Sequence, residues 1–373
     1  MFFTVERNTL LRALGHVTGL VERRNTIPIL GNVLIGTDGE ASITVKATDL
    51  DMEAVETLPA KIEQPGAVTI SAHTLHDIVR KLPDGAEIKI DRGSTDGRLK
   101  VQAGRSTFEL AILPAEEFPN MGQVELPHRF SLPKAELKRL FDKARFAVST
   151  EETRYYLNGI YLHAIDPGGG FRLRAVATDG HRLAQVETDC PDGAQQMPGV
   201  IVPRKAVAEV IKLLDGGDKP VTVSLSDAKI QFEADEVVLT SKLIDGTFPD
   251  YARVIPSNNK KIMTLENADL VTAVDRVSTL SSEKGRAVKL NISQGRLLVS
   301  ANSPESGSAN EEINAEYEGE PMEIGFNARY LLDIAAQIGG ARTQFKLADG
   351  SSPTLVLEEG ESTALYVLMP MRV

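Results

Sequence analysis

The sequence predicts an α+β fold made of three topologically similar domains, each containing two β-α-β-β-β units. Two observations support this fold class. Short patterns recur in the same order at intervals of about 130 residues along the 373-residue chain. Segments with the alternating pattern of strands also far outnumber segments with helical spacing, so the few helices can cover only one face of the sheets.

The repeats begin with a strand that runs directly into an amphipathic helix. One copy starts at Phe3 (FTVERNTLLRALGHV), a second at Phe130 and a third at Met263. A second strand-helix unit recurs inside each third and starts at Val68, Val200 and Met322. We therefore place three domains at residues 1–126, 127–258 and 259–373.

Further echoes support the same division. The pairs Phe118-Pro119 and Phe248-Pro249 lie 130 residues apart, and strand ends at Asp49, Asp179 and Asn302 are in similar register. Apolar residues at intervals of three and four predict helices at 6–20, 72–82, 133–146, 203–214, 267–278 and 327–338. Alternating runs bounded by Gly, Asp and Asn predict strands at 41–47, 50–58, 86–91, 171–178, 221–226, 229–234, 237–243 and 296–302.

Composition excludes several classes of protein. Apolar residues make up 42% of the chain and charged residues 25%, which is typical of a globular protein and excludes a disordered one. No apolar run reaches the roughly 18 residues that a membrane span requires. The first residues carry charge where a signal peptide is apolar, and the single Cys190 cannot form an intrachain disulfide. We expect a cytoplasmic protein without a membrane contact.

Charge is distributed unevenly between the predicted elements. The whole chain carries −11, whereas the six predicted helices together carry +6 and the remainder −17. The cations of the first four predicted helices are Arg7, Arg12, Arg80, Lys81, Lys134, Lys138, Arg139, Lys143, Arg145, Arg204, Lys205 and Lys212. A surface that is basic on its helices and acidic elsewhere attracts phosphates locally, which favours weak, salt-sensitive and sequence-independent binding of nucleic acid.

Motifs for catalysis and metal binding are weak or absent. There is no phosphate-binding G-x-x-x-x-G-K-[ST] loop, no G-x-G-x-x-G after a strand and no H-E-x-x-H. His73 and His76 have a metal-compatible spacing without further ligands, and Asp49, Asp51 and Glu53 would share one face of a strand. We expect no metal and no cofactor. A hydrolase that uses His181 with Asp179 stays an alternative, although no nucleophile motif accompanies the pair.

The motifs that remain carry a family resemblance over the whole chain. They are FTVER at 3–7, TIPILGN at 26–32, RYYLNG at 154–159, ATDGHRL at 177–183, VIVPRK at 200–205, LDGGD at 214–218, FPDY at 248–251, MEIGFN at 322–327 and YVLMPMR at 366–372. In these segments and their order the chain resembles the bacterial sliding clamps, the beta subunits of the replicative DNA polymerase III.

The resemblance implies a head-to-tail homodimer that forms a closed ring around duplex DNA. Such a ring tethers polymerase subunits, the clamp loader and repair proteins through short peptides that contain Gln and Leu or Phe, and it catalyses no reaction. Twelve helices spaced about 10 Å apart around a circle would leave a channel roughly 28 Å wide, which accommodates a duplex and water.

The resemblance also transfers roles to individual residues. DNA contacts are expected at Arg24, Arg154, Tyr155, Tyr156, Arg204 and Lys205. A peptide groove is expected from Leu157, Thr178, Gly180, His181, Arg182, Leu183, Pro249, Arg253, Val254, Pro353, Val367, Met369, Pro370, Met371 and Arg372. At the dimer interface, Phe108 and Leu110 would meet Thr279 and Leu280 of the other chain.

The sequence departs from the family at two places. Glu151 and Glu152 precede RYYLNG where relatives can carry a neutral polar residue, and His73 and Thr74 replace basic residues of some members. The first departure weakens the expected DNA role of that loop. A monomeric adaptor that uses only the C-terminal groove is the second alternative.

Overall fold

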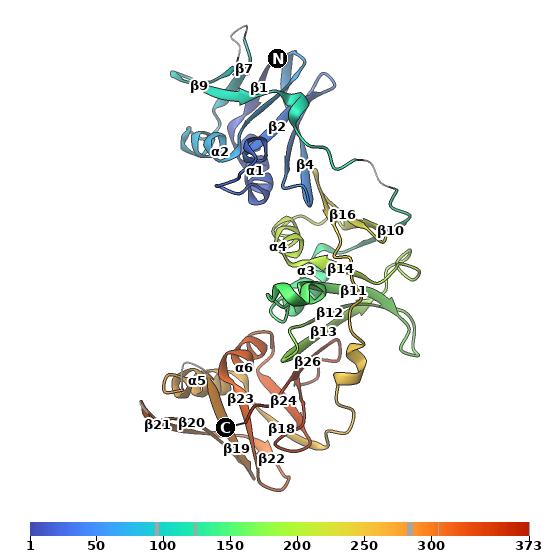
Figure 1. Ribbon diagram of the computed structural model, residues 1–373, viewed down its shortest axis with the longest axis vertical. Coiled ribbons are helices and arrows are strands. Elements are labelled where there is room, and N and C mark those ends of the chain that lie inside the picture. The colour runs from blue at the N-terminus through green and yellow to red at the C-terminus, as the bar shows by residue number, and fades with distance from the viewer. Residues whose placement is uncertain (94–96, 123–124, 282–285, 305, 373) are drawn as a thin grey trace. The chain divides into compact units, whose positions relative to one another are not determined.

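The computed structural model describes residues 1–93, 97–122, 125–281, 286–304 and 306–372 (Figure 1). The first third of the chain contains β1 (Phe2–Glu6), α1 (Arg7–Val17), β2 (Asn32–Asp38), β3 (Ser42–Thr48), β4 (Met52–Pro59), β5 (Lys61–Gln64), β6 (Ala67–Ser71), α2 (Ala72–Lys81), β7 (Glu87–Asp91), β8 (Arg98–Ala103) and β9 (Ser106–Leu113). The middle third contains β10 (His128–Leu132), α3 (Lys134–Arg145), β11 (Gly159–Ile165), β12 (Arg172–Thr178), β13 (Arg182–Asp189), β14 (Val200–Pro203), α4 (Arg204–Leu213), β15 (Val221–Leu225), β16 (Lys229–Ala234) and β17 (Val237–Lys242).

The last third repeats the same order. It contains β18 (Lys261–Glu266), α5 (Asn267–Ser278), β19 (Ala287–Ser293), β20 (Arg296–Ser303), β21 (Gly307–Asn314), β22 (Glu316–Tyr317), β23 (Met322–Asn327), α6 (Ala328–Ala335), β24 (Arg342–Leu347), β25 (Thr354–Glu358) and β26 (Ala364–Leu368). Short 3-10 helices connect these elements at η1 (Thr18–Leu20), η2 (Pro28–Gly31), η3 (Ala115–Glu117), η4 (Glu152–Leu157) and η5 (Tyr251–Val254). Each third is thus two β-α-β-β-β units, with β5 and β22 as short additions, and the predicted fold class is confirmed.

Local sequence explains where the helices begin. The Glu6 carboxylate accepts hydrogen bonds from the backbone N–H groups of Asn8 at 2.9 Å and Thr9 at 2.8 Å, which caps α1. These bonds hold the pKa of Glu6 below its ordinary value. Asn327 caps α6 through Arg329 N–H in the same way. All six predicted helices are confirmed, within three residues at each end.

The contacts divide the chain into two compact units, although the sequence repeats three times. One unit comprises residues 1–138, 191–198 and 205–243, and the other comprises residues 139–190, 199–204 and 244–373. The division falls inside the middle repeat because its two halves belong to different sheets. Strands β10 and β15 to β17 continue the sheet of the first repeat, whereas β11 to β14 continue a sheet of the third.

The first unit is built on a 13-stranded sheet. Its order is β10-β15-β16-β17-β4-β3-β2-β6-β9-β8-β7-β1-β5, and neighbouring repeats are joined where β17 pairs antiparallel with β4. Helices α1 and α2 pack on each other, and α1 also contacts β3 and β4 (Figure 1). Fully buried Leu10, Leu14 and Leu75 form the apolar side of this helix pair.

The second unit contains two sheets. The nine-stranded sheet has the order β14-β11-β12-β13-β26-β25-β24-β18-β22, and the four-stranded sheet has the order β21-β20-β19-β23. Repeats are joined here by β13 and β26, where Arg182 lies opposite Leu368. Helices α5 and α6 pack on each other, and α5 covers β20 and β21 (Figure 1). Within the described residues, no helix is long and apolar enough to cross a membrane.

Strands β9 and β21 both have an open edge, as the other end strands β5, β10, β14, β22 and β23 do. The first residues of β9, Ser106 to Ala111, pair with β8 on one side, and β6 reaches only Ile112 and Leu113. Strand β21 pairs only with β20 and ends the four-stranded sheet. Each edge therefore has a row of backbone groups free to pair with another chain.

Candidate functional site

A tight turn between β12 and β13 organises the candidate peptide groove. The Thr178 hydroxyl donates to the Arg182 carbonyl at 2.7 Å and accepts from Gly180 N–H at 3.1 Å. One Asp179 oxygen accepts from the backbone N–H groups of His181 and Arg182 at 2.9 and 3.0 Å. Gly180 has a φ of +89°, which a residue without a side chain adopts at little cost. The polar motif is therefore a rigid turn.

The first repeat has the same turn. Thr48 Oγ1 donates to Met52 O at 2.7 Å, and one Asp49 oxygen accepts from the N–H groups of Asp51 and Met52. Leu50 stands where Gly180 stands and has a φ of +77°, a conformation that is strained for a residue with a side chain. This match extends the sequence repeat to individual hydrogen bonds.

Arg182 anchors the turn to α6. Its guanidinium donates to Asp179 at 3.1 Å, to the Phe146 carbonyl at 2.7 Å and to Asp333 of α6. The guanidinium carbon also lies 4.3 Å from the centre of the Tyr330 ring, within the range of a cation–π contact. With its side chain only 10% exposed, Arg182 is committed to structural contacts.

The turn borders an apolar groove of about 300 Å³. Its lining residues are Arg154, Tyr156, Leu157, Thr178, Gly180, Arg182, Leu183, Pro249, Asp250, Tyr251, Val254, Val367 and Met369. Its floor is a buried cluster that contains Leu157, Leu183, Phe248, Tyr251 and Val367. A hollow of this kind suits apolar side chains of a short peptide.

Nine of the residues predicted for the groove line it, and six are not among its lining residues. The nine are Leu157, Thr178, Gly180, Arg182, Leu183, Pro249, Val254, Val367 and Met369. Of the others, His181 stacks on Tyr330 with ring centres 6.2 Å apart, and its carbonyl accepts from Met369 N–H. Met371 N–H donates to Gly325, and the Pro353 carbonyl accepts from Asn259. Arg253 pairs with Asp250 at 2.7 Å, Pro370 is half-buried and Arg372 is exposed.

Sequence reasoning missed Asp250 and Tyr251 as groove residues, although the repeated Phe-Pro pair directly before them marked the segment. The Tyr251 hydroxyl lies 3.0 Å from His163 Nε2 and accepts from Arg174 at 3.0 Å. Arg174 is also bonded to Glu187 at 2.7 Å. This buried network fixes Tyr251 at the back of the groove.

His163 is held neutral in this network. Its side chain stacks on Tyr161 with ring centres 4.6 Å apart and is 8% exposed. Burial lowers the pKa of His163 to about 4, and the positive charge of Arg174 acts in the same direction. Burial likewise raises the pKa of Tyr161.

The residues predicted to touch DNA have different surroundings. Arg24 is exposed in the loop between η1 and η2, and Tyr155 is 55% exposed. Arg204 and Lys205 are exposed in the first turn of α4, where Lys205 pairs with Asp49. Arg154 and Tyr156, in contrast, line the groove.

Arg154 is paired with one of the two unusual acids that precede it. Its Nε and Nη2 donate to the Glu151 carboxylate at 2.8 and 2.7 Å. These bonds hold the pKa of Glu151 below its ordinary value and raise that of Arg154. The other side of the guanidinium faces Gly180, where a Cβ would lie 2.6 Å from Nη1.

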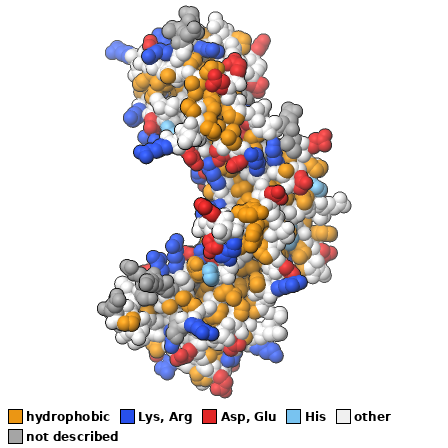
Figure 2. Space-filling view, in the orientation of Figure 1, with side chains coloured by type: hydrophobic (Ala, Val, Ile, Leu, Met, Phe, Trp, Pro, Cys, Tyr) orange, Lys and Arg blue, Asp and Glu red, His pale blue; other side chains and the backbone are white. Residues whose placement is uncertain are grey.

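The expected gathering of free positive charge on the helices is wrong for several residues. Arg7 is buried, where it bonds to Asp84 and to two carbonyls at the end of α2, and Lys134 is buried against Asp235 and Gly216 O. Lys143 pairs with Glu358 and Lys212 with Glu209. Figure 2 shows acidic and basic side chains interspersed on the visible face. Net charge by element does not reveal such pairing.

Two of the residues predicted for the dimer interface lie on the open edge of β9, and the other two lie at the end of α5. Phe108 and Leu110 are half-buried on β9, and their neighbours Thr107 and Glu109 are exposed. Thr279 and Leu280 follow the C-terminal end of α5, which packs on β21, the end strand of the four-stranded sheet. Leu280 is half-buried and Thr279 is exposed.

The alternatives based on catalysis or a metal gain no geometric support. The Asp179 carboxylate is occupied by two backbone N–H groups of the turn and by Arg182, and the imidazole ring of His181 stacks on Tyr330. Asp49 and Asp51 belong to a turn and not to a strand face, and they pair with Lys205 and Lys242. Among the described residues, no group of three or more His, Cys, Asp or Glu side chains could hold a metal ion.

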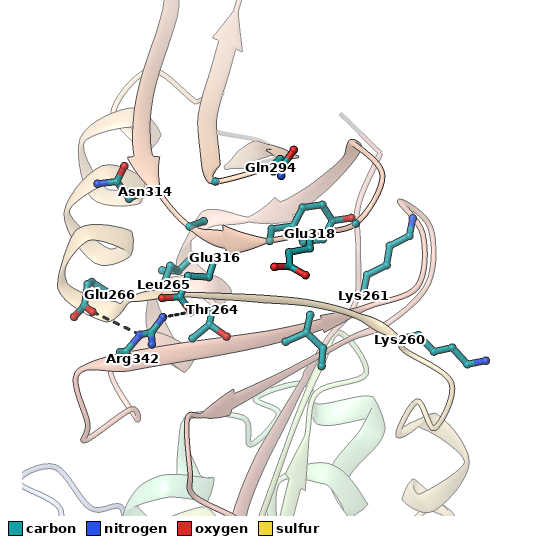
Figure 3. Close-up of a pocket in the computed structure, with 15 residues that line it drawn as sticks. Lys260, Lys261, Thr264, Leu265, Glu266, Gln294, Asn314, Glu316, Glu318 and Arg342 are labelled. Carbon is teal, nitrogen blue, oxygen red and sulfur yellow. Dashed lines mark ion pairs between the residues drawn. The ribbon is translucent and has the colours of Figure 1, made fainter.

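A second, more open cleft of about 980 Å³ lies along β18 and β22 (Figure 3). Arg342 points into it and is surrounded by Glu316 at 2.7 Å, Glu359 at 3.2 Å and Glu266 at 3.6 Å. Because three carboxylates already surround this cation, the cleft is a weaker candidate for a binding site than the apolar groove.

The repeated domains, the sheets shared between repeats and the apolar groove define the class of DNA clamps. Models of the DNA polymerase III beta subunit match the chain in three parts: the N-terminal domain at 1–122, the central domain at 131–250 and the C-terminal domain at 252–372. The chain belongs to this family, the bacterial beta sliding clamps, and the predicted function of a DNA sliding clamp is confirmed.

Individual relatives match over their full length. The beta sliding clamp of Caulobacter vibrioides is 53% identical over 373 residues and that of Escherichia coli K12 is 42% identical over 376 residues, each with 100% of both chains covered. The crystal structure of a Bartonella birtlesii sliding clamp bound to griselimycin is similar with a TM-score of 0.97 at 49% identity, and all of both chains is covered. A Pseudomonas aeruginosa clamp bound to griselimycin has a TM-score of 0.94 at 41% identity.

Proposed function

We propose that two copies of this chain close head-to-tail into a ring around duplex DNA. The ring tethers polymerase subunits, the clamp loader and repair proteins through short peptides that bind the apolar groove, and it catalyses no reaction. We propose that the ring acts in the cytoplasm. We also propose that the domain boundaries lie between residues 126 and 127 and between residues 258 and 259. One observation carries the proposal. Neighbouring repeats are joined by equivalent pairs of strands, and the first and the third repeat each have one strand of this kind that lacks its partner.

The repeated joint follows a simple rule. The last strand of one repeat pairs with the fourth strand of its neighbour, as β17 does with β4 and β26 with β13. The strands left over by this rule are β9 in the first repeat and β21 in the third. Both strands have an open edge: β9 is open along Ser106 to Ala111, and β21 pairs with β20 on one side. A second copy of the chain supplies the missing partner strand for β9 and for β21. Because each joint connects two unlike surfaces, identical joints repeat around a common axis and close a ring.

The register of this joint follows from the repeats. His16 of α1 contacts Glu56 of β4 at 2.8 Å, and Arg276 of α5 contacts Glu311 of β21 at 2.9 Å, so Glu56 and Glu311 are equivalent. In the first unit Val237 lies opposite Glu56 and Leu239 opposite Ala54.

Strand β9 can be aligned with β17 at the residue pair next to the preceding turn. This pair is Ala103 with Ser106 for β9 and Ala234 with Val237 for β17. With the same register in the proposed dimer, Phe108 would lie opposite the partner subunit's Ala309 and Leu110 opposite the partner subunit's Gly307. The small residues leave room for both apolar side chains to reach the end of α5, which bears Thr279 and Leu280.

The proposed DNA contacts are Arg24, Tyr155, Arg204 and Lys205, together with Arg154 and Tyr156 at the groove. The pair on α4 is informative, because two cations in the first turn of a helix face the positive end of its dipole. A phosphate bound at this end would offset that repulsion. Arg154 and Tyr156 line the groove, so DNA and a bound peptide would compete for them.

The proposal that the ring encloses DNA can be tested by measuring how long the protein is retained on circular and on linear DNA. Protein loaded onto a circular plasmid by a clamp loader should remain bound in high salt and leave within minutes when the plasmid is cut once. Equal loss from circular and linear DNA would refute a closed ring. Analytical ultracentrifugation distinguishes the dimeric ring from the monomeric adaptor, because the adaptor predicts a stable species at the 40.4 kDa mass of one chain.

A further inference from the structure

The joint between the first two repeats contains a counterpart of the apolar groove. In the groove, Val367 of β26 lies opposite Leu183 of β13. In the other joint, Thr240 of β17 lies opposite Glu53 of β4. The same polar turn directly precedes Leu183 and Glu53. Strand pairing and turn together make Glu53 the counterpart of Leu183, and Thr240 the counterpart of Val367.

The correspondence extends to the neighbouring strand and to the segment after each Phe-Pro pair. Gln231 of β16 lies opposite Thr240, where the apolar cluster of the groove has Leu355 of β25. Met121 follows the first Phe-Pro pair at the same distance as Tyr251 follows the second. The two joints therefore share a backbone arrangement and differ in the polarity of their side chains.

This counterpart is a polar cavity of about 630 Å³ within the first compact unit. Its lining includes the cations Lys46, Arg129 and Lys229 and the carboxylates Glu53 and Glu125. Three cations against two carboxylates give the cavity a net positive charge on a chain that carries −11. A locally positive cavity on an acidic protein attracts acidic groups.

Lys229 is the most available of these cations. Its Nζ donates to the Met121 carbonyl at 2.6 Å and forms no ion pair among the described residues. An ammonium group has three donors, so two remain for a ligand. Lys46, in contrast, is paired with Glu53 at 3.4 Å, and Arg129 is paired with a carboxylate of β16 at 3.1 Å.

Two buried polar atoms of the cavity lack partners. The Ser224 hydroxyl and the Oε2 atom of Glu53 have no hydrogen-bond partner within the described part of the chain, and Ser224 is only 4% exposed. Unpaired polar atoms of this kind cost free energy, which a ligand recovers if it supplies the partners. Ser224 can donate to a carboxylate, whereas Glu53 requires an N–H donor.

The positions of these two residues suit an extended peptide. Ser224, Gln231, Thr240 and Glu53 lie opposite one another on four successive strands. Three strand spacings amount to about 14 Å, the length of roughly four residues of extended chain. A peptide supplies N–H groups along this length, and an acidic side chain supplies the carboxylate.

We propose that this cavity binds an extended acidic peptide segment of a partner protein, at a second site that shares no lining residue with the apolar groove. A peptide carboxylate binds Lys229 Nζ and the Ser224 hydroxyl, and backbone N–H groups donate to Glu53. A bare anion would leave the Glu53 oxygen without a donor, and an apolar peptide would leave all three groups unpaired. The two joints therefore select partners by the polarity of their peptides.

Two fluorescent peptides test the proposal by anisotropy. One is Gly-Glu-Ser-Asp-Gly-Glu, and the other is its amide counterpart Gly-Gln-Ser-Asn-Gly-Gln. On the unmodified protein at low salt, the acidic peptide should bind about tenfold more tightly, the size of one charge-assisted contact. This preference should fall as salt is raised. An unlabelled peptide with Gln and a Leu-Phe pair, which the apolar groove is proposed to bind, should not displace the acidic peptide.

Three variants assign the preference to the cavity. Lys229→Met should bring the two peptides to equal affinity, and Ser224→Ala should weaken binding of the acidic peptide by about threefold. Lys242→Met is the matched control and should keep the preference. Lys242 lies opposite Lys229 on β17, but it is paired with Asp51 at 3.0 Å and is not among the lining residues of the cavity.

A preference that is lost in Lys229→Met and kept in Lys242→Met would support the site. Absence of binding, or equal affinity of the two peptides for the unmodified protein, would overturn the proposal. A preference that survives Lys229→Met, or that is lost equally in both lysine variants, would also overturn it. Displacement by the Leu-Phe peptide would place the acidic peptide in the apolar groove and reject the second site, whereas binding of the Leu-Phe peptide itself tests the proposed function separately.

Discussion

His163 should make the stability of the second unit depend on pH in the mildly acidic range. Its pKa is lowered from 6.5 to about 4 because the folded environment excludes water and faces Arg174. The unfolded chain therefore takes up this proton first as the pH falls. The contribution of His163 is complete above about pH 7.5, is lost progressively through pH 6.5 and is fully lost below about pH 4.

The size of the effect follows from this difference in pKa. At pH 5 the unfolded imidazole is almost fully protonated, whereas the folded one is still largely neutral. Proton linkage gives a loss of about 2 kcal/mol between pH 7.5 and pH 5, out of roughly 3 kcal/mol for the full shift. His163→Gln removes the titrating ring and keeps a polar partner for the Tyr251 hydroxyl, so this variant should lack that component.

Hydrogen exchange read by mass spectrometry is the suitable assay, because the two compact units need not unfold together. Peptides from β11 and β12 report the local opening free energy after correction for the intrinsic exchange rate at each pH. His181→Gln is the control, because it removes an exposed imidazole from the same unit. The same pH dependence for His163→Gln and the unmodified protein, within about 0.5 kcal/mol, would refute the linkage argument.

Three further perturbations test the joints and the DNA contacts. Leu110→Asp puts an unpaired charge on the open edge of β9 and should give a monomer of 40.4 kDa by light scattering, and a dimer of unchanged affinity would exclude this edge from the interface. Arg182→Ala leaves Asp179 and Asp333 without their shared cation and should destabilise the second unit by about 3 kcal/mol in urea unfolding, so a loss below about 1 kcal/mol would contradict its anchoring role. Lys205→Ala should lower the slope of log affinity for DNA against log salt by about one, and an unchanged slope would remove Lys205 from the contacts.

Much of the local structure could be predicted from the sequence. Helical spacing and caps depend on residues within one or two turns, so α1 and α6 begin beside the capping residues Glu6 and Asn327. The turn at Thr178 is equally local, since its side-chain bonds span at most four residues. The threefold repeat was visible for the same reason, because each copy repeats its local pattern.

Long-range pairing was decided only by the tertiary structure. Nothing near Arg182 in sequence indicates that Asp333, 151 residues away, would bind it, or that Lys134 would be buried against Asp235. The two-unit division likewise depends on β17 meeting β4 and β13 meeting β26. Local propensities set the elements, whereas burial and the satisfaction of buried charges depend on which distant segments the chain brings together, and a count of charges along the sequence does not contain that information.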